Sequence, residues 1–225
     1  MEETRVRLRG IQRKVAQHMV QSKNEIPHVT TIREVRMDKI GELRSQYNQE
    51  HPDQHISFMP YIIAATISAI RAQPVFNARL DGEEIVFCTP INMGIAVTVG
   101  ENLVVPVIHG ASEMNFAQLC AAFHDLTVRA KDGLLKSSDF KDGTFTISNS
   151  GALGGEIFTP IINHPQSAIL GIGRIRQKPI VEETGTIIAC PMMYLCLSYD
   201  HRIINGSQAV GLLSAIDAFL QTPTL

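Results

Sequence analysis

The 225-residue sequence lacks a surplus of positive charge, paired cysteines and long apolar runs. Twenty Lys and Arg stand against 22 Asp and Glu, and the net charge of −2 argues against nucleic-acid binding. The four cysteines form no CxxC pair, which disfavours zinc ribbons and thioredoxin-like sites and favours buried, reduced thiols. No signal-peptide stretch opens the chain, and no apolar run approaches the ~20 residues of a membrane span. We therefore expect a cytoplasmic protein that binds neither nucleic acid nor membrane.

The apolar pattern predicts one domain of the α+β class, with a mixed β-sheet covered by helices. Hydrophobic residues make up 44% of the chain and no polar linker divides them, so residues 1–225 are interpreted as a single domain. A chain of this length buries roughly 70% of its unfolded surface, enough for a core without disulfides or metal. Helices are predicted over residues 11–23, 38 to about 52, 58–71, 115–130 and 207–220, and strands over residues 28–35, 84–88, 91–99, 103–109, 144–149, 168–176, 185–189 and 192–199.

Several residues predict where the helices begin. Asp38 and Ser57 are expected to be N-caps, and Asn115 with Gln118 has the spacing of a capping box. The first helix carries one apolar stripe, formed by Ile11, Val15 and Met19. The helix over 58–71 is apolar nearly all round, so we expect it to be buried.

The first chemical signal is an apolar strand that ends in a charged turn, in the segment SYDHRIING at residues 198–206. Histidine is the side chain best suited to accept a proton near neutral pH, so His201 is a candidate general base. A lone histidine in such a turn is otherwise a surface residue, and the pattern alone leaves both interpretations open. The other seven histidines are interpreted as structural or solvent-facing, with no pair at metal-ligand spacing, so no metal is expected.

The second signal is the glycine-rich segment GTFTISNSGALGG at residues 143–155. Its small residues would let a ligand approach the backbone, and Ser148 could donate a hydrogen bond to a developing oxyanion. The alternative is an ordinary glycine-rich turn. The segment is not a P-loop, because no Gly-Lys-Ser/Thr follows, and Thr146 stands where a nucleophile elbow needs glycine.

Taken together, the segments resemble the catalytic domain of dihydrolipoamide acyltransferases, the E2 core subunits of 2-oxo acid dehydrogenase complexes. The resemblance covers nearly the whole chain, in the family's order. It is carried by LRG at 8–10, IPHVT at 26–30, GIAV at 94–97, LVVPVI at 103–108, the strand at 144–149, TPIIN at 159–163, AILG at 168–171 and DHR at 200–202.

The resemblance implies a chloramphenicol-acetyltransferase-like fold that assembles as a homotrimer, with active sites between subunits. Coenzyme A and a dihydrolipoyl arm would enter a channel from opposite ends. His201 matches the family's catalytic histidine, which deprotonates the attacking thiol. Ser148 matches the family's oxyanion hydroxyl, supplied by the neighbouring subunit. Asn205 stands four residues after the histidine, where most members carry Asp and some carry Asn.

The resemblance also implies a set of coenzyme A contacts. Arg44 matches an arginine suited to a phosphate, and Ser57 matches a position that contacts the cofactor. Their plain alternatives are a solvated helix charge and an N-cap. Asn149 would line the thiol end beside Ser148, and Gly173 would let the ligand pass close to the backbone. Thr98 departs from the Asp of many members, which puts one cofactor hydrogen bond in doubt.

The family's other parts are expected outside these residues. The lipoyl domain with its lipoamide and the subunit-binding domain are absent from them, and the E1 and E3 components are the expected partners. The acyl group is expected to be acetyl or branched-chain. Polar side chains that might bind a succinyl carboxylate are missing from 154–155 and 171–173, although Arg174 and Arg176 lie nearby.

Two alternative functions stay open. One is a non-catalytic structural or binding core, against which the presence of His201 and Ser148 argues. The other is a standalone chloramphenicol-type acetyltransferase, against which the LVVPVI and IPHVT segments argue. A trimer is expected in solution. Any larger 24-mer or 60-mer particle is expected to be weak, because Leu225 is the only obvious anchor in the final segment.

Overall fold

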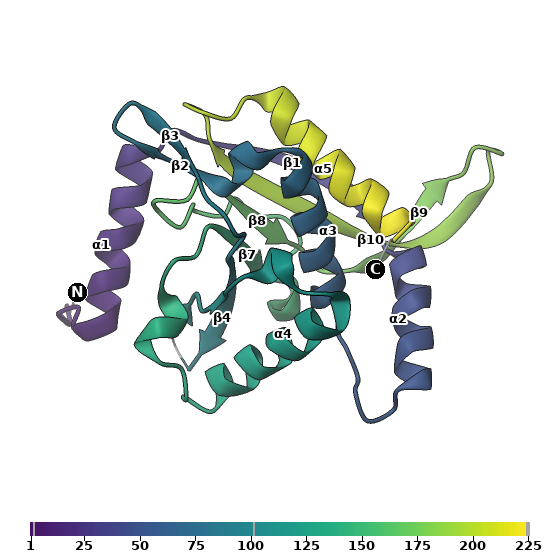
Figure 1. The fold of residues 1–225 in the computed structure, drawn as a ribbon, viewed down its shortest axis with the longest axis horizontal. Coiled ribbons are helices and arrows are strands. Elements are labelled where there is room, and N and C mark those ends of the chain that lie inside the picture. Colours follow the sequence, from purple (N-terminus) through teal and green to yellow (C-terminus); the bar gives the residue numbers. More distant parts are fainter. Residues whose placement is uncertain (2, 101, 224–225) are drawn as a thin grey trace.

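A single mixed sheet forms the centre of the molecule in the computed structural model, which describes residues 1, 3–100 and 102–223 (Figure 1). β7 runs parallel to both of its neighbours, β4 and β8, and the other pairings within the sheet are antiparallel. The strands follow in the order β1 (His28–Arg36), β10 (Ile187–Asp200), β8 (Ala168–Ile172), β7 (Phe145–Asn149), β4 (Met93–Val99) and β5 (Asn102–Val104), with β6 (Val107–Ile108) on β4 and β9 (Arg176–Val181) on β10.

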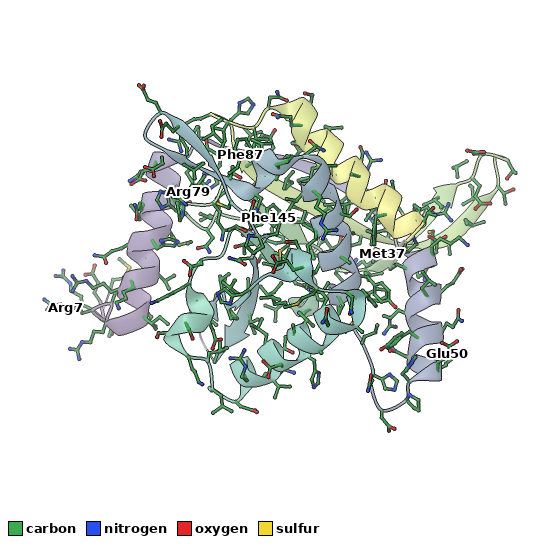
Figure 2. All side chains as sticks on the ribbon, in the orientation of Figure 1. Arg7, Met37, Glu50, Arg79, Phe87 and Phe145 are labelled. Atoms are coloured by element: carbon green, nitrogen blue, oxygen red, sulfur yellow. The ribbon has the colours of Figure 1, made fainter. Side chains whose placement is uncertain are left out.

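Helices cover one face of this sheet, as the α+β prediction requires. They are α3 (Met59–Ala72), α4 (Phe116–Lys131) and α5 (Gly206–Gln221), while α1 (Gly10–Glu25) and α2 (Asp38–Glu50) lie at the edges (Figure 1). The core lies between the sheet and the three covering helices, where Figure 2 shows Phe145 among densely packed side chains. α3 runs through this core with most of its residues buried, so the prediction of a buried helix is confirmed.

The predicted helix starts are partly right. Asn115 and Gln118 form the capping box that opens α4. Asp38 is not an N-cap: Met37 occupies that position, and the Asp38 carboxylate accepts a 2.6 Å hydrogen bond from Arg36 instead. Ser57 precedes the N-cap residue of α3, although its hydroxyl accepts a 3.3 Å hydrogen bond from the Met59 amide in the first turn.

The predicted strands differ from the observed ones where proline or glycine intervenes. The expected strand over 103–109 is divided into β5 and β6 around Pro106. The strands expected over 185–189 and 192–199 are one 14-residue strand, because Pro191 lies in a pairing with β9 that continues through it. β8 ends at Ile172, although the Gly173 amide still donates a 2.9 Å hydrogen bond to the Tyr194 carbonyl of β10. The hairpin of β2 (Ala78–Asp81) with β3 (Glu84–Phe87) turns at Gly82, and β2 was missed because ARLD lacks β-branched residues.

The apolar stripe of α1 is exposed in a single chain. α1 lies at the outer edge of the molecule (Figure 1), and its only buried residue is Ser22. Of the stripe residues, Ile11 is 46% exposed and Val15 is 39% exposed. The helix therefore presents apolar side chains that this chain alone does not cover.

The cysteines are reduced and mostly buried, as expected. Cys120, Cys190 and Cys196 are buried and Cys88 is half-buried. Burial raises the pKa of Cys120 to about 11, so this thiol stays protonated at neutral pH. Within the described part of the chain, no helix is long and apolar enough to cross a membrane, and no group of His, Cys, Asp and Glu has a metal-binding arrangement.

Candidate active site

Ser148 lies near the carboxyl end of the central strand β7. It is half-buried and is paired with Ala96 of β4 on one side and Gly171 of β8 on the other. Its neighbours on both sides are fixed by ladder hydrogen bonds, so a rigid part of the sheet holds the serine.

A hollow of about 400 Å³ opens beside Ser148. Its walls come from segments far apart in sequence, including Met59 of α3, Val97 of β4, Leu103 of β5 and Phe123 of α4. Thr98 lies on its rim, at the position where many family members were expected to carry Asp. None of the described lining residues bears a charged side chain. The hollow therefore suits an uncharged group.

A second hollow of about 220 Å³ adjoins the first. It brings together three of the four predicted coenzyme A contacts, Ser57, Asn149 and Gly173. Met59 and Asn149 line both hollows, and the Asn149 amide nitrogen lies 3.5 Å from the Met59 sulfur. The two side chains thus form a shared wall between the hollows.

The backbone packing around Gly173 by itself requires a glycine at this position. A Cβ at this position would lie 2.0 Å from the Glu156 carbonyl oxygen, and one at Gly151 would lie 2.5 Å from the Gly173 carbonyl oxygen. Only glycine lets the loop after β7 sit this closely on the end of β8. The packing of this loop requires the glycine whether or not a ligand passes it.

Arg44 of α2 stands beside the second hollow. Its guanidinium carbon lies 4.5 Å from the centre of the Phe58 ring, and Phe58 lines that hollow. The Arg44 Nε is buried and has no hydrogen-bond partner among the described residues. A buried donor without a partner is costly, and an anionic ligand would supply one.

His201 lies in the turn after β10, at the other end of the sheet. Its side chain is exposed, and its backbone amide donates a 3.2 Å hydrogen bond to the Pro27 carbonyl. The preceding Asp200 is 2% exposed, and its carboxylate accepts hydrogen bonds from the Arg202 guanidinium, the shortest at 2.6 Å. The backbone of the turn is therefore tightly held, while the imidazole projects from it.

Asn205 caps α5. Its side-chain oxygen accepts hydrogen bonds from the Gln208 amide at 3.0 Å and from the Ser207 hydroxyl at 2.6 Å. The backbone amide of Asn205 donates to the Gln208 side-chain oxygen, which completes a capping box. This cap went unnoticed in the sequence, although the Asn-x-x-Gln spacing is the same as at Asn115.

Within one chain, Ser148 and His201 lie far apart. Ser148 pairs with Gly171, which pairs in turn with Cys196, so two strand steps separate them across the sheet, about 10 Å. His201 then lies five residues beyond Cys196, about 17 Å further along the strand direction. The structure thus brings Ser148, Asn149, Ser57 and Gly173 together and leaves His201 and Asn205 at the opposite end.

Other lining residues were not predicted. Phe58 and Met59 were recognised only as part of a helix start, and Phe123 and Thr127 of α4 only as part of a helix. No local signal marks them, because the tertiary packing of α3 and α4 against the sheet brings them to the hollows.

Comparison with known proteins identifies the class to which this site belongs. All 225 residues match the 2-oxoacid dehydrogenases acyltransferase catalytic domain, and the chain belongs to that family. It is 40% identical over 222 residues to the succinyltransferase component of the 2-oxoglutarate dehydrogenase complex of Rickettsia typhi, covering 97% of this chain and 56% of the relative. It is 39% identical over 227 residues to the acetyltransferase component of the pyruvate dehydrogenase complex of Staphylococcus aureus, covering 99% and 53%. The chain spans about half the length of these relatives.

Solved structures share the fold. The dihydrolipoamide acetyltransferase of Azotobacter vinelandii and the cubic core of a pyruvate dehydrogenase multienzyme complex each match with a TM-score of 0.92 at 27% identity, covering 98% of this chain and 92% of theirs. In the Azotobacter enzyme, one serine, one histidine and one asparagine were investigated for roles in the catalytic mechanism. Chloramphenicol acetyltransferase matches with a TM-score of 0.57 at 16% identity, covering 91% and 94%, which confirms the predicted fold type.

Proposed function

We propose that this chain is the catalytic part of a dihydrolipoamide acyltransferase, which passes an acyl group between dihydrolipoamide and coenzyme A. The observation that carries the proposal is the position of Ser148 beside two adjoining hollows, one uncharged and one next to Arg44, whose buried Nε has no hydrogen-bond partner among the described residues. The uncharged hollow suits an acyl thioester, and the arginine beside the second hollow suits a thiol that bears phosphates. Membership in the acyltransferase family supports the same activity.

The proposed chemistry is transfer between two thiols. A free thiol has a pKa near ~8.5 and is mostly protonated at neutral pH, so His201 removes the proton as the sulfur attacks the thioester carbonyl. A new carbon–sulfur bond forms, and Ser148 donates a hydrogen bond to the resulting oxyanion. The intermediate collapses by breaking the old carbon–sulfur bond, and the departing thiolate takes the proton back from His201.

We propose that two copies of the chain complete each site in a homotrimer. The separation of Ser148 from His201 supports this, because no side-chain movement spans such a distance within one chain. The exposed apolar stripe of α1 supports it as well, since a neighbouring copy would cover it. In the Azotobacter enzyme the asparagine named with the histidine follows it by four positions, the same spacing as from His201 to Asn205.

Coenzyme A is proposed to occupy the second hollow. Arg44 would bind a phosphate, Ser57 and Asn149 would hydrogen-bond the pantetheine arm, and the Gly173 backbone would lie along it. The thiol would then emerge past Asn149 and reach Ser148. The lipoyl group would arrive on a lipoyl-lysine of a separate domain, with E1 and E3 components as the wider partners.

The acyl group is proposed to be acetyl or branched-chain. The hollow beside Ser148 is lined by uncharged side chains, so a succinyl carboxylate would lose its hydration without gaining a cation. Arg174 lines the second hollow rather than this one, and Arg176 is paired with Glu156 at 2.6 Å. Relatives of similar identity include both succinyl and acetyl enzymes, so identity alone does not decide.

The test is an acyl-transfer assay with acetyl-, isobutyryl- and succinyl-coenzyme A, each with dihydrolipoamide and with chloramphenicol as acceptor. We expect transfer to dihydrolipoamide, with acetyl or isobutyryl donors preferred over succinyl. Transfer only to chloramphenicol would indicate a standalone acetyltransferase. A folded, oligomeric protein without any transfer would indicate a structural core component. A preference for succinyl would overturn the acyl assignment alone.

A further inference from the structure

His28 lies at the start of β1 and makes two hydrogen bonds through its ring. Nδ1 lies 2.8 Å from the Ile26 carbonyl oxygen, and Nε2 lies 3.0 Å from the Ile162 amide nitrogen. The amide can only donate, so Nε2 must accept and Nδ1 must carry the hydrogen. These contacts define a neutral ring in one tautomer.

The two bonds join the linker before β1 to the loop that contains Ile162. Ser22 holds the same residue from the other side, because its hydroxyl donates a 2.6 Å hydrogen bond to the Ile162 carbonyl. Ile26, Ile162 and Ile169 form a small buried cluster beneath these bonds. Ser22 and Ile162 are fully buried, which makes the hydrogen bonds that join them at this junction costly to lose.

This junction holds the backbone of His201. Ile26, Pro27 and His28 are consecutive, and the carbonyl of the middle residue accepts the hydrogen bond from the His201 amide. In the ladder, His28 is also directly opposite Asp200, the residue before His201. The His28 ring therefore fixes the segment 26–28, and the Pro27 carbonyl of this segment holds the backbone of the turn that contains His201.

The charges around His28 come from all the elements packed against it. Lys23 of α1 disfavours its protonation and Asp200 favours it, while Asp200 is itself engaged by Arg202. Glu25 is paired with His164 at 2.9 Å, and His18 lies 2.9 Å from the Asn163 side chain. Burial lowers the pKa of His28 below its ordinary value, although the hydrogen bond to Ile26 opposes the shift.

We propose that His28 is a positioning residue for His201, whose neutral ring locks the Pro27 carbonyl in place and releases it when protonated. The proposal rests on the proposed function, in which His201 is the base. A protonated ring loses its acceptor at Nε2 and can no longer bind the Ile162 amide. The enzyme would then lose turnover in acid as His28 takes up a proton, and burial, which lowers the pKa of His28, moves this loss to lower pH.

The test compares His28→Leu, which removes both ring bonds, with His28→Gln, which keeps an acceptor near Nε2 and does not titrate. A displacement of about 1 Å costs up to ~10²-fold in rate, so we expect His28→Leu to lower kcat about 10- to 100-fold with the KM for coenzyme A unchanged. His28→Gln should keep most of the wild-type kcat. As the pH falls, kcat should decrease more steeply in the wild type than in His28→Gln, because only the wild type can protonate the ring nitrogen that accepts from the Ile162 amide.

His164→Gln is the matched control, because it removes the 2.9 Å contact of the His164 ring with Glu25 in the same junction and leaves both ring bonds of His28 in place. Its kcat and the acid dependence of its kcat should equal those of the wild type. The same acid dependence of kcat in the wild type and in His28→Gln, or equal losses in His28→Leu and His164→Gln, would overturn the proposal.

A second readout needs no turnover and keeps the two proposals separable. The backbone amide resonance of His201 should shift in His28→Leu and stay in place in His164→Gln. An unmoved resonance would overturn the positioning role even if acyl transfer were absent. If His28→Leu does not fold, the pH dependence of kcat in His28→Gln, compared with that of the wild type, still tests the proposal.

Discussion

The two ends of the central sheet are built in opposite ways. Around Ser148 the chain forms adjoining hollows of about 400 and 220 Å³, floored by apolar side chains and bordered by a glycine-rich loop. Around His201 the chain forms a turn held by the Pro27 carbonyl and by the Asp200–Arg202 pair, with an exposed imidazole.

The difference shows what each end is able to do. Hollows hold ligands, and a rigid turn presents a base in a fixed direction, but neither end suffices for acyl transfer. Since one chain keeps the ends far apart, we propose that the reaction uses the hollow of one copy and the turn of another. The following experiments test this division of roles, beginning with the largest expected effect.

His201→Ala removes the proposed base. Turnover should fall roughly 10²–10⁴-fold, because the attacking thiol must then lose its proton without help. Steady-state kinetics measures the loss, and circular dichroism with thermal unfolding checks that the fold is intact. Near-wild-type turnover in this variant would show that the base lies elsewhere.

Ser148→Ala removes the proposed oxyanion donor from the hollow. We expect turnover to fall on the order of 10²–10³-fold, while the dissociation constant for coenzyme A stays within about twofold. Isothermal titration calorimetry separates the two effects. A large loss of coenzyme A affinity with unchanged turnover would make Ser148 a binding residue instead.

Co-expression of His201→Ala chains with Ser148→Ala chains tests the division directly. Mixed trimers should recover about a third of wild-type turnover, because one of the three interfaces in each mixed trimer joins an intact serine to an intact histidine. Two affinity tags isolate the mixed particles, and separately purified variants that do not exchange subunits serve as the control. If tagged mixed trimers recover nothing, each site lies within a single chain.

Arg44→Ala tests the charge beside the second hollow. A charge-assisted hydrogen bond contributes about 1.5–3 kcal/mol, so the KM for coenzyme A should rise roughly 10- to 100-fold with little change in kcat. Lys39→Ala on the same helix is a matched control, because Lys39 is exposed and pairs only with Glu42 at 3.4 Å. An equal rise in the KM for coenzyme A in both variants would show that Arg44 acts only as a general surface charge.

Asn205 should show the smallest effect of the set. Asp is as good an N-cap as Asn, so Asn205→Asp should keep both stability and turnover, whereas Asn205→Ala should cost about 1 kcal/mol of unfolding free energy. Denaturant unfolding measures the second value. A collapse of turnover in a stable Asn205→Asp protein would assign the neutral amide a part in the chemistry.

Local sequence patterns predicted most helices and strands of this fold. They failed where the bounds of a strand depend on the neighbouring strand with which it pairs. The capping box at Asn115 depends on two residues three apart, and the burial of α3 follows from its apolar composition, so both were readable. The continuity of β10 through Pro191 was not, because the neighbouring strand β9 maintains the pairing there. The expected anchor Leu225 lies outside the described residues.

For the site, the sequence by itself determined the chemical groups. A histidine after an apolar strand and a serine before a glycine-rich loop stand out in the sequence, but the local pattern alone left both interpretations open, and the resemblance to the acyltransferase family singled out His201 and Ser148. The tertiary structure alone decided how they are distributed. Strand order placed Ser148 between β4 and β8 and left His201 beyond the end of β10, and the packing of α3 and α4 brought Met59 and Phe123 to the hollow. These contacts join residues far apart along the chain, so their geometry follows from the packing of the whole fold and from no local pattern.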